Sequence, residues 1–146
     1  MRILPADPGL LIVSCDGAAR GNPGPAGFGV QIVDERGTVV AELAGWLGET
    51  TNNVAEYTAA REGLRRAAEL GARRVHLRSD SQLLIEQLSG RYKVKAAHLR
   101  PLYADVRGAM AGFDDVALEH VPRERNREAD RLANEGVDRG LRERRT

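Results

Sequence analysis

The chain has 146 residues, of which 42% are hydrophobic and 29% charged, and it carries a formal net charge of +1. This length suits one ordinary domain and excludes a second, and no apolar run approaches the roughly 20 residues that a membrane-spanning helix needs. The N-terminal residues contain no apolar core followed by a cleavage site, and the single cysteine cannot form an internal disulfide. We therefore expect one cytoplasmic domain, residues 1–146, without a membrane partner, and nothing in its composition demands more than a monomer.

Three strands are predicted in the first third of the chain. Residues 9–17, GLLIVSCDG, form a continuous apolar run that ends at Asp16, which predicts a strand buried on both faces and central in its sheet. Residues 27–48 contain two β-branched runs around the turn residues 34–37, the pattern of a hairpin. The first three strands should therefore be antiparallel, with Trp46 packed in the third.

A helix, a fourth strand and a short helix follow. Either Asn52 or Asn53 can cap a helix that runs to about Leu70. Residues 73–80 alternate between apolar and polar side chains, which predicts the fourth strand. Apolar residues at helical spacing then predict a short helix that ends at Gly90.

The last third of the chain completes the predicted sheet. A third helix fits Ala97–Met110, residues 114–121 read as a fifth strand, and Asn126 can cap a last helix with an apolar stripe. The core should span about residues 10–138, and residues 139–146 should be a frayed tail or a linker to a further domain. This order of elements predicts an α/β fold in which a mixed five-stranded sheet carries helices on both faces.

Four carboxylates fall at the ends of these predicted elements. Asp16 and Asp80 end strands, whereas Glu56 and Asp130 lie in the first turns of helices, so all four could meet at one edge of the sheet. Taken singly, Glu56 and Asp130 could favour a helix dipole, and Asp80 could be a helix cap. Taken together, four neighbouring carboxylates repel one another unless a cation compensates them. Oxygen ligands without a Cys/His cluster point to Mg²⁺ or Mn²⁺.

Four stretches of the chain are similar to the signature blocks of type 1 ribonuclease H: DGAARGNPGPAGFG, TTNNVAEYTAA, SDSQLLIEQLSGRYKVK and HVPRERNREADRLAN. They occur in the family's order and cover about residues 10–138. The resemblance implies the ribonuclease H-like fold and a metal-dependent endonuclease that cuts the RNA strand of RNA/DNA hybrids, leaving 5′-phosphate and 3′-hydroxyl ends. Whether it also cuts double-stranded RNA is left open.

The resemblance also implies two Mg²⁺ or Mn²⁺ ions per active site when substrate is bound. Asp16 would contact both ions. Asp130 would complete the site of the ion that activates water, and Glu56 and Asp80 would hold the ion facing the departing 3′ oxygen.

Substrate contacts follow from the same blocks. Glycines such as Gly17 allow a close backbone approach. By resemblance, five further residues contact the hybrid in its minor groove or at phosphate and base: Asn22, Thr51, Asn52, Asn53 and Gln82. Helix capping is the competing interpretation for Asn52 and Asn53, and an ordinary exposed helix position is the alternative for Gln82.

The chain departs from well-known members in two respects. It resembles a short form that lacks the long basic protrusion, so hybrid affinity should depend on Arg20, Lys93, Lys95 and the C-terminal arginines. The loop before the last carboxylate also lacks the histidine that many members use to assist proton transfer or product release. Arg123 is the expected replacement and Glu124 its competitor, whereas three histidines are expected to be structural or at the surface: His76, His98 and His120.

Two other functions compete with a free-standing enzyme. One is a non-catalytic module that binds RNA/DNA hybrids, although all four carboxylates are present. The other is the ribonuclease H domain of a larger bifunctional protein. A different nuclease with the same fold is disfavoured, because such nucleases lack the TTNN and SDSQ blocks.

Overall fold

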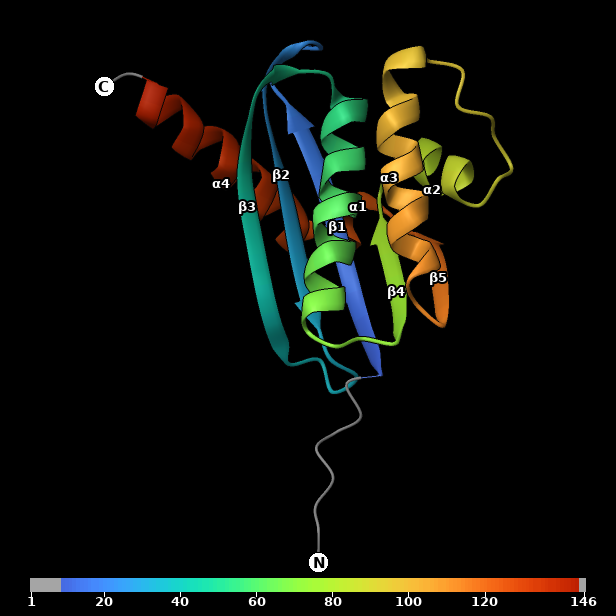
Figure 1. Ribbon diagram of the computed structural model, residues 1–146. Helices are drawn as coiled ribbons and strands as arrows, with labels where there is room; N and C mark the ends of the chain where they lie inside the picture. The colour runs from blue at the N-terminus through green and yellow to red at the C-terminus, as the bar shows by residue number, and fades with distance from the viewer. Residues whose placement is uncertain (1–8, 145–146) are drawn as a thin grey trace, which may run out of the picture.

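The computed structural model describes residues 9–144 (Figure 1). The strands and α-helices of this part of the chain follow one another in this order: β1 (Leu10–Ala19), β2 (Gly24–Val33), β3 (Val39–Thr50), α1 (Asn52–Glu69), β4 (Arg74–Ser79), α2 (Gln82–Leu88), α3 (Arg100–Ala111), β5 (Asp115–His120) and α4 (Arg127–Arg144). Single 3-10 turns at Ala97–Leu99 and Arg123–Arg125 precede α3 and α4.

The five strands form one mixed sheet in the order β3-β2-β1-β4-β5. β2 is antiparallel to both β1 and β3, whereas β4 is parallel to both β1 and β5. Helices α1 and α3 cover one face of the sheet and α4 covers the other (Figure 1). The predicted fold is therefore confirmed, and β1 is the middle strand, as its continuous apolar run indicated.

The main core lies between α1 and the sheet. Val13 and Val30 project from the sheet, Leu64 projects from α1, and all three side chains are fully buried. Burying a side chain of this size stabilises the fold by roughly 1.5–3 kcal/mol. The buried hydroxyl of Tyr57 donates a 2.6 Å hydrogen bond to Oε1 of Gln87, which ties α1 to α2.

The predicted hairpin and the packing of Trp46 are confirmed. Oδ1 of Asp34 accepts hydrogen bonds from the backbone N–H groups of Arg36 and Thr38, both 2.9 Å long, and these bonds close the turn between β2 and β3. The ring of Trp46 packs against α4 at Gly140, where any side chain would overlap it.

Two predictions for the first half of the chain were wrong, one on the end of β1 and one on the cap of α1. Asp16 lies inside β1 and not at its end, because β1 stays paired with β2 as far as Ala19. The cap of α1 is Thr51, whose Oγ1 accepts from the N–H of Val54 at 3.3 Å, and so neither Asn52 nor Asn53 caps the helix.

The other corrections concern later helices. Glu56 falls in the second turn of α1, not the first. The cap of α2 is Ser81 rather than Asp80. Helix α3 begins at Arg100, three residues later than predicted, with Pro101 in its first turn, where a missing N–H costs little.

The end of the chain also differs from the prediction. Asn126 directly precedes α4, but its side chain does not cap the helix: Nδ2 donates to the backbone carbonyl of Cys15 at 2.9 Å, and Oδ1 has no hydrogen-bond partner in the described part of the chain. Residues 139–144 continue α4 rather than fraying. Arg144 pairs with Glu49 of β3 at 3.2 Å, an anchor that the sequence pattern does not reveal.

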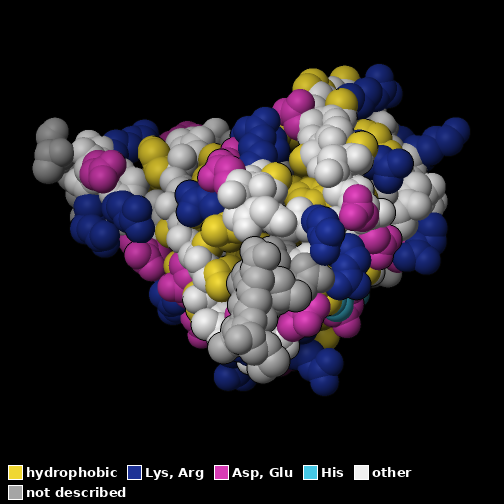
Figure 2. All heavy atoms as spheres, turned by 60° about the horizontal axis from the view of Figure 1, so that its bottom comes forward, with side chains coloured by type: hydrophobic (Ala, Val, Ile, Leu, Met, Phe, Trp, Pro, Cys, Tyr) yellow, Lys and Arg dark blue, Asp and Glu magenta, His cyan; other side chains and the backbone are white. Residues whose placement is uncertain are grey.

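The surface chemistry is mixed. Figure 2 views the molecule from the lower end of Figure 1, where Lys and Arg side chains are interspersed with Asp and Glu. Charge of one sign is therefore not concentrated on this face. Within residues 9–144, no helix is both long enough and apolar enough to cross a membrane.

Candidate metal and nucleic-acid site

The middle strand places Asp16 against α1 because of the glycine that follows it. A Cβ at Gly17 would overlap the backbone of Ala55 and Glu56, so only glycine lets α1 approach β1 this closely. This approach brings the Glu56 side chain next to Asp16, which is only 4% exposed. The side chain of Glu56 is thus placed by packing between a strand and a helix backbone.

A second glycine brings in the last helix. Gly29 of β2 is the register partner of Asp16, and a Cβ there would overlap the backbone of α4 at Ala129 and Ala133. Asp130 lies between these two residues, in the first turn of α4 as predicted. Neighbouring positions of the sheet therefore contact α1 through β1 and α4 through β2.

The fourth carboxylate follows β4 directly. Ser79, the last residue of β4, accepts through its carbonyl a 2.9 Å hydrogen bond from the N–H of Val121. The ring Nε2 of His120 lies 3.2 Å from the carbonyl oxygen of Asp80. The end of β5 therefore fixes the backbone that carries Asp80.

Three of the four carboxylates form a tight cluster. Asp16, Glu56 and Asp80 each offer an oxygen, and these oxygens lie within 4.8 Å of one another. Asp130 lies outside this cluster but lines the same depression of about 590 Å³. The predicted convergence of the four residues is present in the fold.

Burial and mutual repulsion make this cluster hard to ionise. The pKa of Asp16 is raised to about 8; burial is the larger cause, and the charge of Asp80 is the next. Burial first, and then the charge of Asp16, raises the pKa of Glu56 well above its usual value. The cluster therefore needs either protons or a cation.

The donor atoms fit a hard divalent cation. Oε2 of Glu56 is buried and has no hydrogen-bond partner in the described part of the chain, which is unusual for a carboxylate oxygen. Carboxylate oxygens are the ligands that Mg²⁺ and Mn²⁺ prefer. A bound cation would both satisfy this oxygen and offset the repulsion between the carboxylates.

Two of the predicted substrate-contacting asparagines interlock at the rim. Oδ1 of Asn22 accepts from the N–H of Asn52 at 3.1 Å, and Oδ1 of Asn52 accepts from the N–H of Ala19 at 2.9 Å. Both oxygens face protein donors, so the Nδ2 groups remain available for acceptors outside the protein. Asn52 therefore does not cap α1, the competing interpretation, but links the β1–β2 turn to this helix.

The remaining predicted residues do not all line the depression that contains the carboxylates. Gly17, Asn53 and Arg123 line the depression that contains them, whereas Gln82 is exposed at the first position of α2 and does not line it. His120, which we expected to be structural, also lines it. Its position at the end of β5 was predicted, but its proximity to Asp80 depends on the parallel pairing of β4 with β5.

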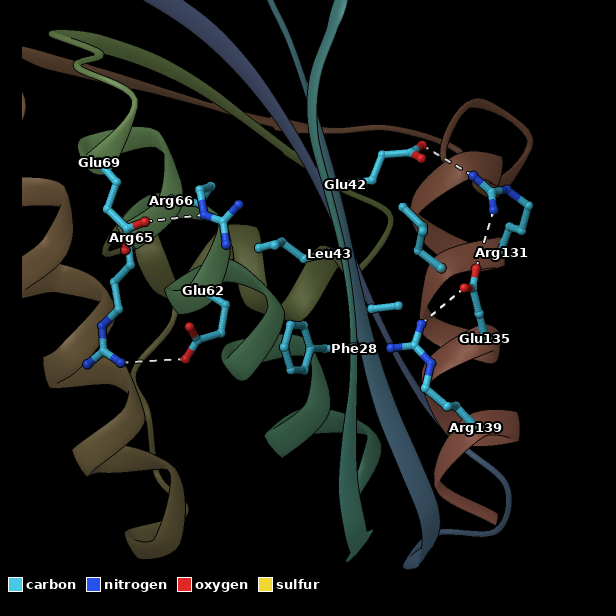
Figure 3. Close-up of a pocket in the computed structure, with 12 residues that line it drawn as sticks. Phe28, Glu42, Leu43, Glu62, Arg65, Arg66, Glu69, Arg131, Glu135 and Arg139 are labelled. Carbon is cyan, nitrogen blue, oxygen red and sulfur yellow. Dashed lines mark hydrogen bonds and ion pairs between the residues drawn. The ribbon is translucent and has the colours of Figure 1, made fainter. Parts of the chain in front are cut away.

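A larger depression of about 810 Å³ lies elsewhere, around the edge strand β3 and between α1 and α4 (Figure 3). Its charged side chains neutralise one another within the depression. Arg131 pairs with Glu42 at 3.2 Å, and Arg139 pairs with Glu135 at 3.0 Å. The smaller depression, with its crowded carboxylates, is therefore the better candidate for a site.

Comparison with known proteins agrees with this geometry. Residues 14–136 match the model of a family described as reverse transcriptase-like. The structure of RNase H1 from Halobacterium salinarum superposes with a TM-score of 0.86 at 44% identity, over 89% of this chain and 98% of that one. The chain therefore belongs to the reverse transcriptase-like family and, within it, to the type 1 ribonucleases H.

Two further relatives bear on function. LC11-RNase H1, solved in complex with an RNA/DNA hybrid, has a TM-score of 0.85 at 41% identity, over 90% of this chain and 99% of that one. A bifunctional protein of Mycobacterium tuberculosis is 44% identical over 129 residues, which are 88% of this chain and 35% of that protein. The chain thus spans about a third of the length of its mycobacterial relatives.

Proposed function

We propose that this domain is an endonuclease that hydrolyses the RNA strand of RNA/DNA hybrids. The observation that carries the proposal is the cluster of Asp16, Glu56 and Asp80, with its crowded oxygens and the partnerless Oε2 of Glu56. Membership of the type 1 ribonucleases H and the hybrid bound to LC11-RNase H1 support the substrate class.

Each carboxylate has a separate proposed role. Asp16, at the centre, would serve both of two divalent ions, Mg²⁺ or Mn²⁺. Glu56 and Asp80 would hold one ion, and Asp130 on α4 would hold the other. Such ions would lower the pKa of water and offset the charge that develops on the phosphate and on the leaving oxygen.

The rim of the site recognises the hybrid. The Nδ2 groups of Asn22 and Asn52 point to acceptors outside the protein, since their oxygens are already engaged. Asn53 and Gln82 contact the minor groove beside them, where the 2′-hydroxyl distinguishes RNA from DNA. Thr51 supports this rim through its cap of α1, and Gly17, which lines the depression, presents its backbone to the strand that is cut.

A third depression, next to the rim, suits the uncut strand. Asn53 lines both this depression and the one that contains the carboxylates. The third depression is also lined by the exposed ring of Tyr92, with Lys93 and Lys95 beside it. Aromatic and cationic side chains together bind nucleic-acid strands by stacking and by phosphate contacts. We assign the DNA strand to this surface, which takes the place of the absent basic protrusion.

Arg123 is the proposed auxiliary residue. It lies in the 3-10 turn between β5 and α4 and lines the depression with the four carboxylates. A guanidinium in this place can hold the cleaved phosphate, which would leave as a 5′-phosphate opposite a 3′-hydroxyl. Its competitor Glu124 does not line the depression with the carboxylates but lines another, with Arg125.

A cleavage assay on four substrates tests the proposal. Three substrates contain end-labelled RNA, as a single strand, as an RNA/DNA hybrid and as an RNA/RNA duplex. The fourth is an end-labelled DNA duplex with a single ribonucleotide. Each is tested in Mg²⁺, in Mn²⁺ and in EDTA. We expect cutting of the hybrid's RNA with either metal and none in EDTA. A folded protein that binds the hybrid without cutting it would instead be a hybrid-binding module.

The parent protein can contain more than this domain. The mycobacterial relative is described as bifunctional, and this chain matches 35% of it. We therefore propose the same hybrid-cutting role whether the domain acts alone, as a cytoplasmic monomer, or within a longer protein. Comparing the isolated domain with the full-length parent in the same assay would show whether other parts change its substrates.

A further inference from the structure

Asp130 is connected to a row of polar side chains along α4. Asn134, one turn further on, donates from Nδ2 to the backbone carbonyl of Asp130 at 3.0 Å and to its Oδ1 at 3.4 Å. Asp130 lies outside the group of three carboxylates, although its side chain interacts with that of Asp16. The amide of Asn134 is the hydrogen-bond donor that contacts its carboxylate from within α4.

Arg20 determines which way the Asn134 amide faces. Its Nη2 donates to Oδ1 of Asn134 at 3.3 Å and to the backbone carbonyl of the same residue at 3.5 Å. A guanidinium has only donors, so the amide oxygen must face Arg20, and the NH₂ group must then face Asp130. The flipped amide would place a donor against a donor and an oxygen against a carboxylate.

Asp138 anchors the arginine in turn. Its Oδ1 lies 2.7 Å from Nη1 of Arg20, a short, charge-assisted contact. Asp130, Asn134 and Asp138 occupy successive turns of α4, at spacings of four residues, so they form one row facing the segment that follows β1. Arg20 lies across this row and contacts two of its three members.

We propose that Asn134 is a positioning residue for Asp130, and that Arg20, anchored by Asp138, holds the amide of Asn134 in its donating orientation. The proposal rests on the assigned role of Asp130 as a metal ligand. Hydrogen bonds of this kind fix the orientation of a ligating carboxylate, and their loss typically lowers metal affinity or activity about 10–100-fold. Asn134 therefore acts through Asp130 and not on the hybrid itself.

The kinetic test varies Mn²⁺ with hybrid as substrate and compares wild type with Asn134→Ala. We expect the Mn²⁺ concentration for half-maximal kcat to rise about tenfold, while KM for the hybrid changes less than about twofold. Alanine favours helix, so the variant should remain folded, which its circular dichroism checks. If the wild type cuts the hybrid and Asn134→Ala shows the same Mn²⁺ dependence, the proposal is overturned.

A double variant separates the proposed relay, in which Arg20 acts on Asp130 through the amide of Asn134, from direct binding of substrate by Arg20. Arg20→Ala should raise the Mn²⁺ requirement in the wild-type background but add nothing to it in the Asn134→Ala background, because it acts through that amide. Arg139→Ala, which removes another ion-paired arginine from α4 remote from the site, is the matched control and should leave the requirement unchanged. Full additivity of the two variants would contradict the relay.

A spectroscopic test needs neither activity nor metal. The Nδ2 resonances of Asn134, assigned from their absence in Asn134→Ala, should shift in Arg20→Ala and in Asp138→Asn but not in Arg139→Ala. Resonances that ignore Arg20 would overturn the proposed orientation of the amide. Because this measurement does not depend on cleavage, it remains decisive for the amide even if the domain proves not to cut hybrids.

Discussion

Gly17 packs directly against the backbone of Glu56, and this contact brings two carboxylates from different elements together. A Cβ at Gly17 would overlap the backbone of α1, so no residue with a side chain fits at this position. The carboxylate before it, Asp16, and the carboxylate on the helix then lie in one cluster. A strand–helix packing contact therefore sets the geometry of the proposed metal site.

This contact predicts that Gly17→Ala damages both stability and cleavage. The added methyl must push α1 away from β1, and overpacking of this kind costs about 1–3 kcal/mol of the free energy of unfolding. Urea denaturation measures the loss, and cleavage should fall because Glu56 moves with the helix. The matched control is Gly108→Ala in α3, where the new Cβ meets nothing within 4 Å. It should stabilise the fold by roughly 0.5–1 kcal/mol, since alanine is the better helix former.

The raised pKa of Asp16 predicts how stability depends on pH in metal-free protein. Its pKa in the folded state is about 8, above the value of roughly 4 expected in the unfolded chain. Stability from this group is therefore fully present below pH 4 and is lost as the pH rises through 8. Glu56 shifts in the same direction.

Thermal unfolding in EDTA measures this effect. We expect Tm to fall between pH 5 and pH 9, and added Mg²⁺ to restore part of it at the alkaline end. Asp16→Asn cannot ionise, so it should flatten the dependence and raise Tm at pH 9 while abolishing cleavage. A variant whose Tm falls with pH as steeply as that of wild type would show that the crowding of carboxylates is not responsible.

Tyr57→Phe should separate stability from activity. The substitution leaves Oε1 of the buried Gln87 without its 2.6 Å hydrogen bond, which costs about 1–3 kcal/mol. Cleavage at a temperature where the variant stays folded should remain within about twofold of wild type. Tyr92→Phe removes the hydroxyl of an exposed tyrosine and should change the free energy of unfolding by less than about 0.5 kcal/mol. Equal losses in the two variants would argue against the buried hydrogen bond.

Hybrid binding should depend on salt through the lysines next to the rim. If Lys93 and Lys95 each contact a phosphate, replacing both with alanine should reduce the slope of log K against log salt by roughly 2. Fluorescence anisotropy with a labelled hybrid, under conditions that prevent cleavage, measures this slope. Arg36→Ala, in the turn between β2 and β3, serves as the control and should leave the slope unchanged. An unchanged slope in the double lysine variant would remove the DNA strand from this surface.

The sequence was sufficient to predict the order of elements, because apolar periodicity and capping residues are local signals. This order was in turn sufficient to predict that the four carboxylates meet at one edge of the sheet. It could not place Asp16 inside β1, since the strand continues only through its pairing with β2. The role of Gly29 was also missed. A glycine in a strand carries no sign that a helix backbone will pack on it, and that contact positions Asp130.

The cap of α4 and its last turns were mispredicted for a similar reason, although the helix begins directly after Asn126, as predicted. Asn126 is of a residue type that caps helices, but the carbonyl of Cys15, 111 positions earlier, accepts its amide hydrogen bond. The last turns of α4 looked like a frayed tail because their partner, Glu49, lies on the edge strand. Such contacts depend on the assembled sheet and cannot be read from neighbouring residues.

The most direct test of the carboxylate site is the rate of RNA cleavage in an RNA/DNA hybrid by Asp80→Asn in Mg²⁺. Asp115→Asn, which neutralises an exposed aspartate at the start of β5, is the matched control. We expect Asp80→Asn to fold like wild type but to lose metal-dependent cleavage, while Asp115→Asn cuts at the wild-type rate. Cleavage by Asp80→Asn at the wild-type rate would contradict the assignment of this site.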